Sequence, residues 1–311
     1  MKTAWQGFFA IFAAAILPFS LPAGGGEPVR PAATLPNPAL GQTRTGESPG
    51  AAGDQASGRV QPPQTLSPAE AFAAISTEAE KGVPTAMLTL GTMYERGIGT
   101  PRNFIKALEW YRKAAEAGLA EGYYNVGVCH EIGMGTAGGQ EEAFIKFEKS
   151  AELGLAQGLY KLASLYFLGF GTAKNEQWGV ELLKRATAAG HMVAANDLGV
   201  IHFSGDFGQA KNSELAFDMF TRAAQLGNAE AMKNLAVFYR DGLGGRAADP
   251  VQELKWYLLS RRAGFPPAAL DKTIEDLRAR IGPDRATSVD AEVESWIADF
   301  RARQPQPPAT P

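Results

Sequence analysis

The chain has 311 residues, of which 30 are Lys or Arg and 33 are Asp or Glu, so its net charge at neutral pH is −3. This length allows a large core or an extended array, and the slightly acidic balance argues against nucleic acid as a partner. The single cysteine, Cys129, excludes an internal disulfide framework and a cysteine-cluster metal site.

The N-terminal residues predict export from the cytoplasm. Lys2 carries the only charge in the first 26 residues, and residues 8–17 are almost entirely apolar. A basic start, a short apolar run and a small residue at Ala23 are typical of a secretory signal peptide over residues 1–23. The alternative is an uncleaved membrane anchor. We therefore expect a periplasmic or secreted protein, or an inner-membrane anchor that holds a repeat domain in the periplasm.

Residues 24–65 differ sharply in composition from the rest of the chain. They are rich in Gly, Pro and Ala and contain no aromatic residue. Such a segment buries too little apolar surface to offset the entropy lost on ordering, so it predicts a disordered linker. The tail, residues 304–311, is predicted to be disordered for the same reason.

An internal repeat organises the middle of the chain. Gly82, Gly118, Gly154 and Gly190 are spaced by 36 residues, and two further glycines follow at intervals of 37 residues. Counted from each of the first five glycines, a Leu or Val returns after eight residues, a Gly or Ala after nine, a Tyr or His after twelve and a Gly after fifteen. Five matching units of this length indicate a helical repeat protein.

Each unit is predicted to form two helices. The apolar residues of the first helix lie on one stripe, and the small residue at the ninth position allows a neighbouring helix to approach closely. A Gly-x-Gly pattern, as in Gly97-Ile98-Gly99, then turns the chain. The second helix, ALEWYRKAAEAG in the first unit, supplies large core residues such as Trp110 and Tyr111 and a pair of alanines for close packing.

The segments AMLTLGTMYERGIG and KALEWYRKAAEAG resemble the Sel-one-like repeat family, which is related to tetratricopeptide repeats. The resemblance covers Gly82–Gly264 and implies an all-α fold, a right-handed superhelical α/α solenoid of antiparallel helix pairs. The segment SPAEAFAAISTEAEKG resembles a preceding half unit. We therefore expect a repeat domain over residues 66–264 and capping helices over residues 265–303.

The residues with catalytic potential are better explained by the repeat. His130 and His202 occupy the Tyr position, His191 follows a repeat glycine, and Cys129 occupies an apolar position. The glycine-rich turns follow helices and lack the Lys and Ser/Thr order of a phosphate-binding loop. The sequence therefore predicts no catalytic residue, no metal and no cofactor.

The first helices of tetratricopeptide-like units line a concave face, and this analogy predicts a partner-binding groove. The predicted groove residues are Tyr124, Tyr160, Phe167, Asn196, Phe203 and Arg240. Aromatic side chains exposed in a concavity with a polar rim suit peptide binding. The alternative is that the superhelix turns these side chains into the interior.

The resemblance implies a non-enzymatic scaffold or adaptor. We expect an exported regulator of envelope or signalling proteins that binds a protein or peptide segment of unknown identity. Neither nucleic acid nor membrane is an expected partner, except through an uncleaved N-terminal segment. One alternative is a hydrolase of cell-wall or β-lactam substrates, and another is a secreted protein that binds host proteins.

Overall fold

The structure is a computed structural model that describes residues 66–266, 268 and 270–304. The predicted signal peptide, the predicted linker and almost all of the predicted tail lie outside the described residues. The described part forms thirteen α-helices and no strand. The helices are α2 (Pro68–Glu80), α3 (Pro84–Arg96), α4 (Phe104–Glu116), α5 (Ala120–Ile132), α6 (Gln140–Glu152), α7 (Ala156–Leu168), α8 (Glu176–Ala188), α9 (Met192–Ser204), α10 (Ser213–Gln225), α11 (Ala229–Asp241), α12 (Pro250–Arg262), α13 (Asp271–Ile281) and α14 (Pro283–Arg303).

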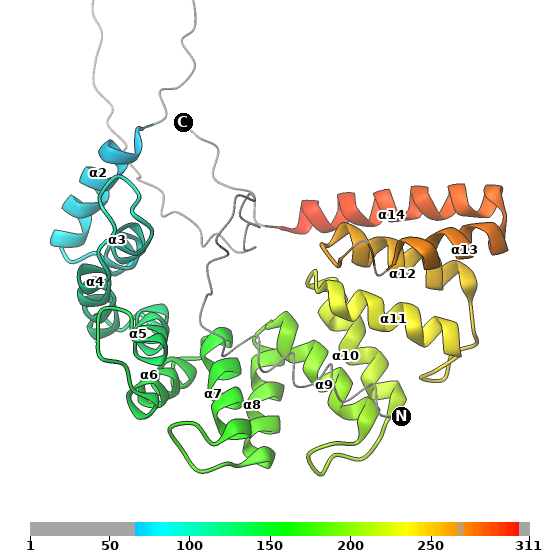
Figure 1. The fold of residues 1–311 in the computed structure, drawn as a ribbon, viewed down its shortest axis with the longest axis horizontal. Coiled ribbons are helices and arrows are strands. Elements are labelled where there is room, and N and C mark those ends of the chain that lie inside the picture. The colour runs from blue at the N-terminus through cyan, green and yellow to red at the C-terminus, as the bar shows by residue number, and fades with distance from the viewer. Residues whose placement is uncertain (1–65, 267, 269, 305–311) are drawn as a thin grey trace, which may run out of the picture.

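The helices follow one another as a stack that bends into an open arc, with α2 at one end and α14 at the other (Figure 1). Each helix packs against its neighbours in sequence, and α2 to α12 all contain 13 residues. The predicted all-α solenoid of antiparallel helix pairs is confirmed. In the part of the chain that the structure describes, no helix is long and apolar enough to cross a membrane.

Two local signals set the helix boundaries in each repeat. Asparagine side chains cap several of the second helices, as when the backbone N–H of Lys106 donates to Oδ1 of Asn103 over 3.0 Å. Each first helix ends on a glycine in the left-handed region, such as Gly97 with φ of 73°. A side chain at that φ is strained, which explains the glycine fifteen residues after each repeat glycine.

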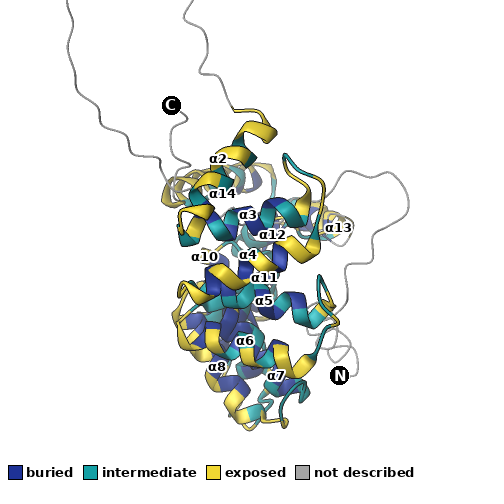
Figure 2. Cartoon of the chain, turned by 90° about the vertical axis from the view of Figure 1, so that its left-hand side faces the viewer, coloured by how far each residue is buried: buried dark blue, intermediate teal, exposed yellow. Residues whose placement is uncertain are grey.

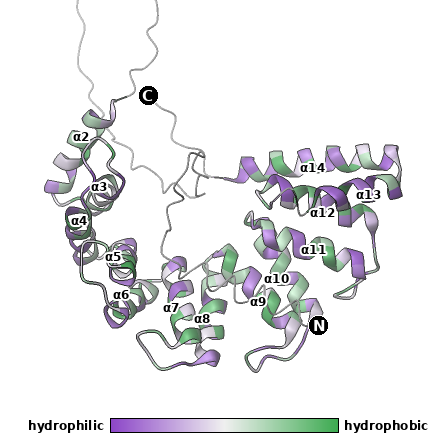
Figure 3. Cartoon of the chain, in the orientation of Figure 1, coloured by the Kyte–Doolittle hydropathy of each residue, from purple (hydrophilic) through white to green (hydrophobic). Residues whose placement is uncertain are grey.

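The core lies between the helices, because each helix presents an apolar side to its neighbours and a polar side to solvent (Figures 2 and 3). The small residue at the ninth position lets the second helix approach. A Cβ added at Gly91 would lie 2.6 Å from the Tyr111 ring, and one at Gly199 would lie 2.6 Å from the Phe220 ring. The predicted close approach is therefore confirmed, and the rings fill the space that a Cβ would need.

The turn after α9 departs from the glycine pattern. Among the described residues, Phe207 has the only positive φ outside glycine, 54°. Its ring lies 4.8 Å from the Phe167 ring, measured between centroids. The packing of Phe207 against α7 therefore accompanies a backbone conformation that costs about 1 kcal/mol or more for a residue with a side chain.

Helices outside the repeats cover both ends of the stack. At the N-terminal end, Ser67 and Glu70 form a reciprocal capping box that begins α2. At the C-terminal end, α13 and α14 pack on α12, and the Arg280 guanidinium pairs with the buried carboxylate of Glu253 over 2.8 Å. These terminal helices provide the polar outer surfaces that a repeat array needs at its ends.

Candidate functional site

The first helices of successive repeats, α3, α5, α7, α9 and α11, form one face of the stack, here called the first-helix face. Ion pairs and hydrogen bonds between side chains join successive first helices directly, with no second helix between them. Nζ of Lys161 on α7 lies 2.9 Å from Oε2 of Glu131 on α5. The hydroxyl of Tyr160 on α7 donates to Oδ2 of Asp197 on α9 over 3.1 Å. The first helices of the second, third and fourth repeats are therefore in direct side-chain contact.

A buried polar cluster joins the third, fourth and fifth repeats. The Tyr160 ring stacks on the His191 imidazole with centroids 4.4 Å apart. Asn196 lies beside Asp197, with its amide Nδ2 3.5 Å from the Asp197 carboxyl, and its Oδ1 accepts a hydrogen bond from Nδ2 of Asn234 over 3.1 Å. Burial without such partners would cost about 1–3 kcal/mol for each polar group, so the cluster also fixes the spacing of the repeats.

Burial shifts the pKa values of Asp197 and His191 in this cluster in opposite directions. It raises the pKa of Asp197 from 3.8 to about 7, because a buried carboxylate loses its hydration. It lowers the pKa of His191 from 6.5 to about 4. The neutral imidazole accepts a hydrogen bond at Nδ1 from the backbone N–H of Ala194 over 3.1 Å and so caps α9. His191 thus has the structural role that its place in the repeat predicted.

Three of the six predicted groove residues are buried. Tyr160 is 9% exposed, Phe167 6% and Asn196 2%. The expectation that Tyr160 and Phe167 present exposed aromatic rings to a partner is wrong for this structure. The physical reason is the short distance between successive first helices, which brings α9 and the turn after it over these side chains. The alternative, in which the superhelix turns them inward, describes the structure correctly.

The other three predicted groove residues reach the surface. Tyr124 and Phe203 are half-buried. Arg240 is exposed, and its guanidinium forms a 2.7 Å ion pair with the neighbouring carboxylate of Asp241. The binding of a partner by these three residues stays a prediction.

The sequence analysis did not single out three of the residues that form these polar contacts between first helices. Lys161, Asp197 and Asn234 occupy the seventh position after their repeat glycines, and each bonds to a residue on the preceding first helix. These partners lie 30 to 38 residues away in the sequence. These contacts between first helices are here called the polar seam. The signal for it in the sequence was that polar residues recur one repeat apart at adjacent positions.

Cys129 is fully buried in the core of the first two repeats. Burial raises the pKa of its thiol to about 12, so the thiol stays protonated and unreactive at neutral pH. The described residues contain no group of three or more His, Cys, Asp or Glu side chains placed to hold a metal ion.

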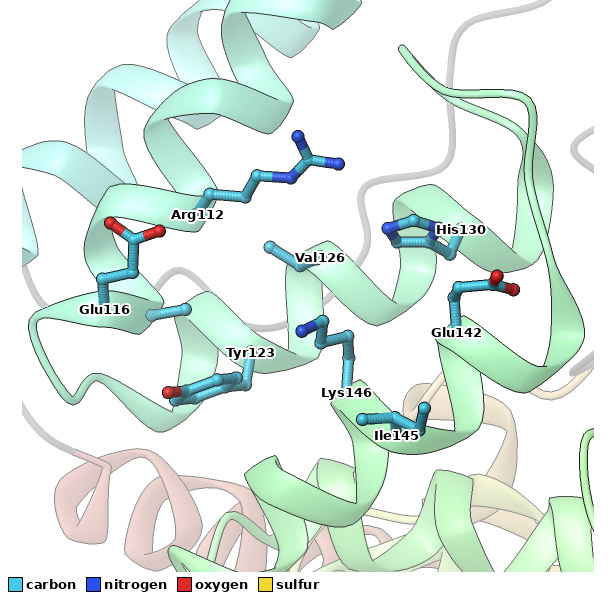
Figure 4. A pocket seen from close by; sticks show the side chains of 9 residues that line it. Arg112, Glu116, Tyr123, Val126, His130, Glu142, Ile145 and Lys146 are labelled. Atoms are coloured by element: carbon cyan, nitrogen blue, oxygen red, sulfur yellow. The ribbon is translucent and has the colours of Figure 1, made fainter.

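A pocket of about 450 Å³ opens between α4 and α6, with α5 as its floor (Figure 4). Ala115 and Val126 give it an apolar base. Figure 4 shows that Arg112 and Lys146 extend over Val126 from opposite walls. The remaining lining residues are Glu116, Tyr123, His130, Glu142 and Ile145.

An open stack of antiparallel helix pairs, each about 36 residues long, defines the class of α/α solenoid repeat proteins. The chain belongs to the Sel1 repeat family. The family profile, described as Sel1 repeat, matches residues 84–119, 120–155, 156–191, 193–228 and 229–265. Proteins of this family generally mediate protein–protein interactions.

Two solved structures are similar along most of the described chain. A Sel1 repeat protein from Oxalobacter formigenes is 26% identical, with a TM-score of 0.62, over 73% of this chain and 93% of its own. A protective antigen of uropathogenic Escherichia coli strains that displays the same repeat fold is 26% identical, with a TM-score of 0.56, over 73% of this chain and 49% of its own. A search of curated proteins found no match.

Proposed function

We propose that this chain is an exported, non-enzymatic interaction scaffold that works in the periplasm and regulates an envelope or signalling protein. The arc of five contiguous repeats carries the proposal (Figure 1). An open arc offers an extended surface for another protein. The interaction role of the family supports the same function.

The first-helix face is the surface on which we place the partner. Tyr124 and Phe203 lie on it as half-buried rings, and Glu121 on α5 and Arg240 on α11 provide charge of both signs beside them. A partly apolar centre with a polar rim is the usual composition of a protein interface. The partner class is therefore a folded protein or a long peptide segment that follows several repeats.

Affinity capture from an envelope extract, followed by mass spectrometry, tests this proposal with the full chain as bait. The charge reversals Glu121→Lys and Arg240→Glu should remove the captured partner. The reversals Glu109→Lys and Asp218→Lys, at exposed positions of the second helices, should leave it bound. Capture that survives the first pair, or is lost only with the second, would place the partner on another face.

Export and the absence of catalysis need separate tests. The basic start and apolar run at the N-terminus support export, and fractionation would separate a periplasmic protein from an anchored or secreted one. Robust turnover of a β-lactam or a cell-wall fragment by the purified protein would overturn the non-enzymatic part of the proposal. Recovery mainly in the culture medium would favour a secreted protein that meets host proteins, a role that the antigen from Escherichia coli makes worth testing.

A further inference from the structure

The pocket between α4 and α6 arises from one exception in the repeat pattern. Lys146 is the seventh residue of α6. The same position of the other four second helices holds a large apolar residue: Trp110, Leu182, Met219 and Trp256. The second repeat therefore lacks the side chain that would fill this space, and a flexible cation stands in its place.

The pocket floor shows a second reduction in volume. Val126 stands at the position where the other four first helices carry leucine. A valine in place of leucine and a lysine in place of tryptophan, leucine or methionine both remove apolar volume from the same interface. The resulting pocket of about 450 Å³ is within the roughly 300–1,000 Å³ range of ligand pockets.

The pocket rim carries a third exception. Ile145 is 55% exposed. The equivalent position of the other second helices is charged in every case: Glu109, Glu181, Asp218 and Lys255. An exposed isoleucine at this position contributes little to the stability of the fold. Beside the unfilled apolar part of the pocket, here called the seat, it enlarges the apolar surface that a partner can cover.

The charges around the pocket select the occupant. The side chains of Arg112 and Lys146 form no ion pair or hydrogen bond with the described residues, and their head groups flank the centre of the pocket (Figure 4). Glu116 and Glu142 lie toward opposite ends. Nδ1 of His130, in the pocket wall, is buried without a hydrogen-bond partner. The centre is therefore complementary to one anionic group attached to an apolar body.

We propose that this pocket is a socket for a short acidic segment of a partner protein, which places an aromatic side chain in the unfilled seat and a carboxylate between Arg112 and Lys146. The partner's aromatic ring takes the position that Trp110 and Trp256 occupy in their own repeats. Residues 24–65 and 305–311 of this chain contain no aromatic residue, so those segments do not supply the anchor. The inference goes beyond the proposed function, since the socket opens between second helices and does not depend on the first-helix face.

Fluorescence anisotropy with a panel of labelled hexapeptides tests the socket on the full chain. Each peptide carries one Trp, Tyr or Phe flanked at different positions by Asp or Glu. We expect a subset to bind, and we expect binding to weaken about tenfold or more when the aromatic residue becomes Ala or the acidic residue becomes Lys. Failure of the whole panel to bind the wild-type chain would overturn the proposal.

Protein variants separate the socket from general attraction to the surface. Lys146→Trp fills the seat with the residue found in two other repeats and should abolish binding, and Arg112→Glu should weaken it at least about tenfold. The matched control is Lys149→Ala, an exposed lysine of the same helix paired with Glu152, which should bind as the wild type does. Unchanged binding by Lys146→Trp would overturn the proposal.

A second copy of the chain is the competing occupant. Sedimentation of the wild type and of Lys146→Trp would reveal it, since a dimer that the substitution dissociates would assign the socket to self-association and overturn the partner proposal. Circular dichroism of each variant checks the fold, and Ile145→Glu gives an independent loss of binding if Lys146→Trp does not fold. Capture of the partner on the first-helix face is a separate readout, so either proposal can fail alone.

Discussion

Two interfaces of this stack use the same repeat position in opposite ways. In the third repeat, Leu182 is 1% exposed and packs into the core formed with α7 and α9. In the second repeat, Lys146 stands at that position and leaves a pocket lined by unpaired cations. The backbone pattern is shared, so the difference lies in the side chains. A departure from the repeat pattern can therefore be satisfied by neighbouring side chains, or it can leave space and charge without a partner.

The polar seam between the first helices illustrates the satisfied kind of departure. Tyr160, Asp197 and Asn196 look like surface polar residues in the sequence, but each has a partner on a neighbouring helix. The pocket of the second repeat illustrates the other kind, in which volume and charge are left without partners.

Leu182→Ala should lower the free energy of unfolding by about 2–5 kcal/mol, because it removes a fully buried side chain and leaves a cavity. Lys146→Ala, at the equivalent position of the second repeat, should change it by less than about 1 kcal/mol. Urea denaturation of the two variants beside the wild type measures both values. Equal losses would mean that the lysine stem fills its interface as the leucine does, which would remove the basis of the contrast.

Asp197, which is buried, and His191, which is half-buried, should give opposite pH dependences of stability. Between pH 4 and 6.5 the folded chain holds more protons at Asp197, whose pKa is raised to about 7, so its contribution falls as pH rises. His191 has a lowered pKa, about 4, so its contribution rises with pH over the same window. In the wild type the two slopes largely cancel.

Single substitutions should expose each slope. In Asp197→Asn, the contribution of these two positions to stability should rise by roughly 1 kcal/mol per pH unit between pH 4 and 6.5, because His191 alone of the two still titrates. In His191→Asn, it should fall by a similar amount. Asparagine suits the second change because Asn228 caps α11 through the same kind of bond, over 2.8 Å. Thermal unfolding at several pH values gives the slopes, and parallel curves for the two variants would contradict the assignment.

The sequence predicted the repeat architecture and the helix boundaries to within a few residues. It did not predict which individual side chains are buried. The repeat glycines, the apolar stripe and the small ninth residue are local patterns, and they predicted the helix pairs because local geometry requires them. The burial of Tyr160 and Phe167 depends on how far each repeat rotates relative to the next. That rotation arises from packing between residues more than thirty positions apart, which a tetratricopeptide analogy does not supply. The pocket could have been suspected from the sequence, because Lys146 replaces the large apolar residue found at the same position of the other second helices. A single exception of this kind predicts a pocket only when the side chains around it are known.

Filling the pocket should stabilise the chain. Lys146→Trp should raise the free energy of unfolding by about 0.5–2 kcal/mol, the range usual for cavity-filling changes. The gain would show that the wild type retains an unfilled seat at the expense of stability, as binding sites commonly do. Differential scanning calorimetry measures the shift in Tm, and a lower Tm would indicate that the space is too small for the indole.

The smallest effect is expected at Arg240. Its ion pair with Asp241 is largely exposed, so Arg240→Ala should change the free energy of unfolding by at most about 0.5 kcal/mol. Loss of captured partner by a variant of unchanged stability would then report on contact alone. A destabilisation above about 1 kcal/mol would show instead that Arg240 supports the fold.

The constant length of α2 to α12, 13 residues each, has a consequence for how such a chain changes over generations. A whole unit can be duplicated or deleted without altering the phase of the remaining helices, so the array is modular in length. The two specialised regions limit that freedom. Removing the second unit would delete the socket, and inserting a unit between the third and fourth would separate Tyr160 from Asp197. Family members of different lengths should therefore gain or lose units most easily outside these two junctions.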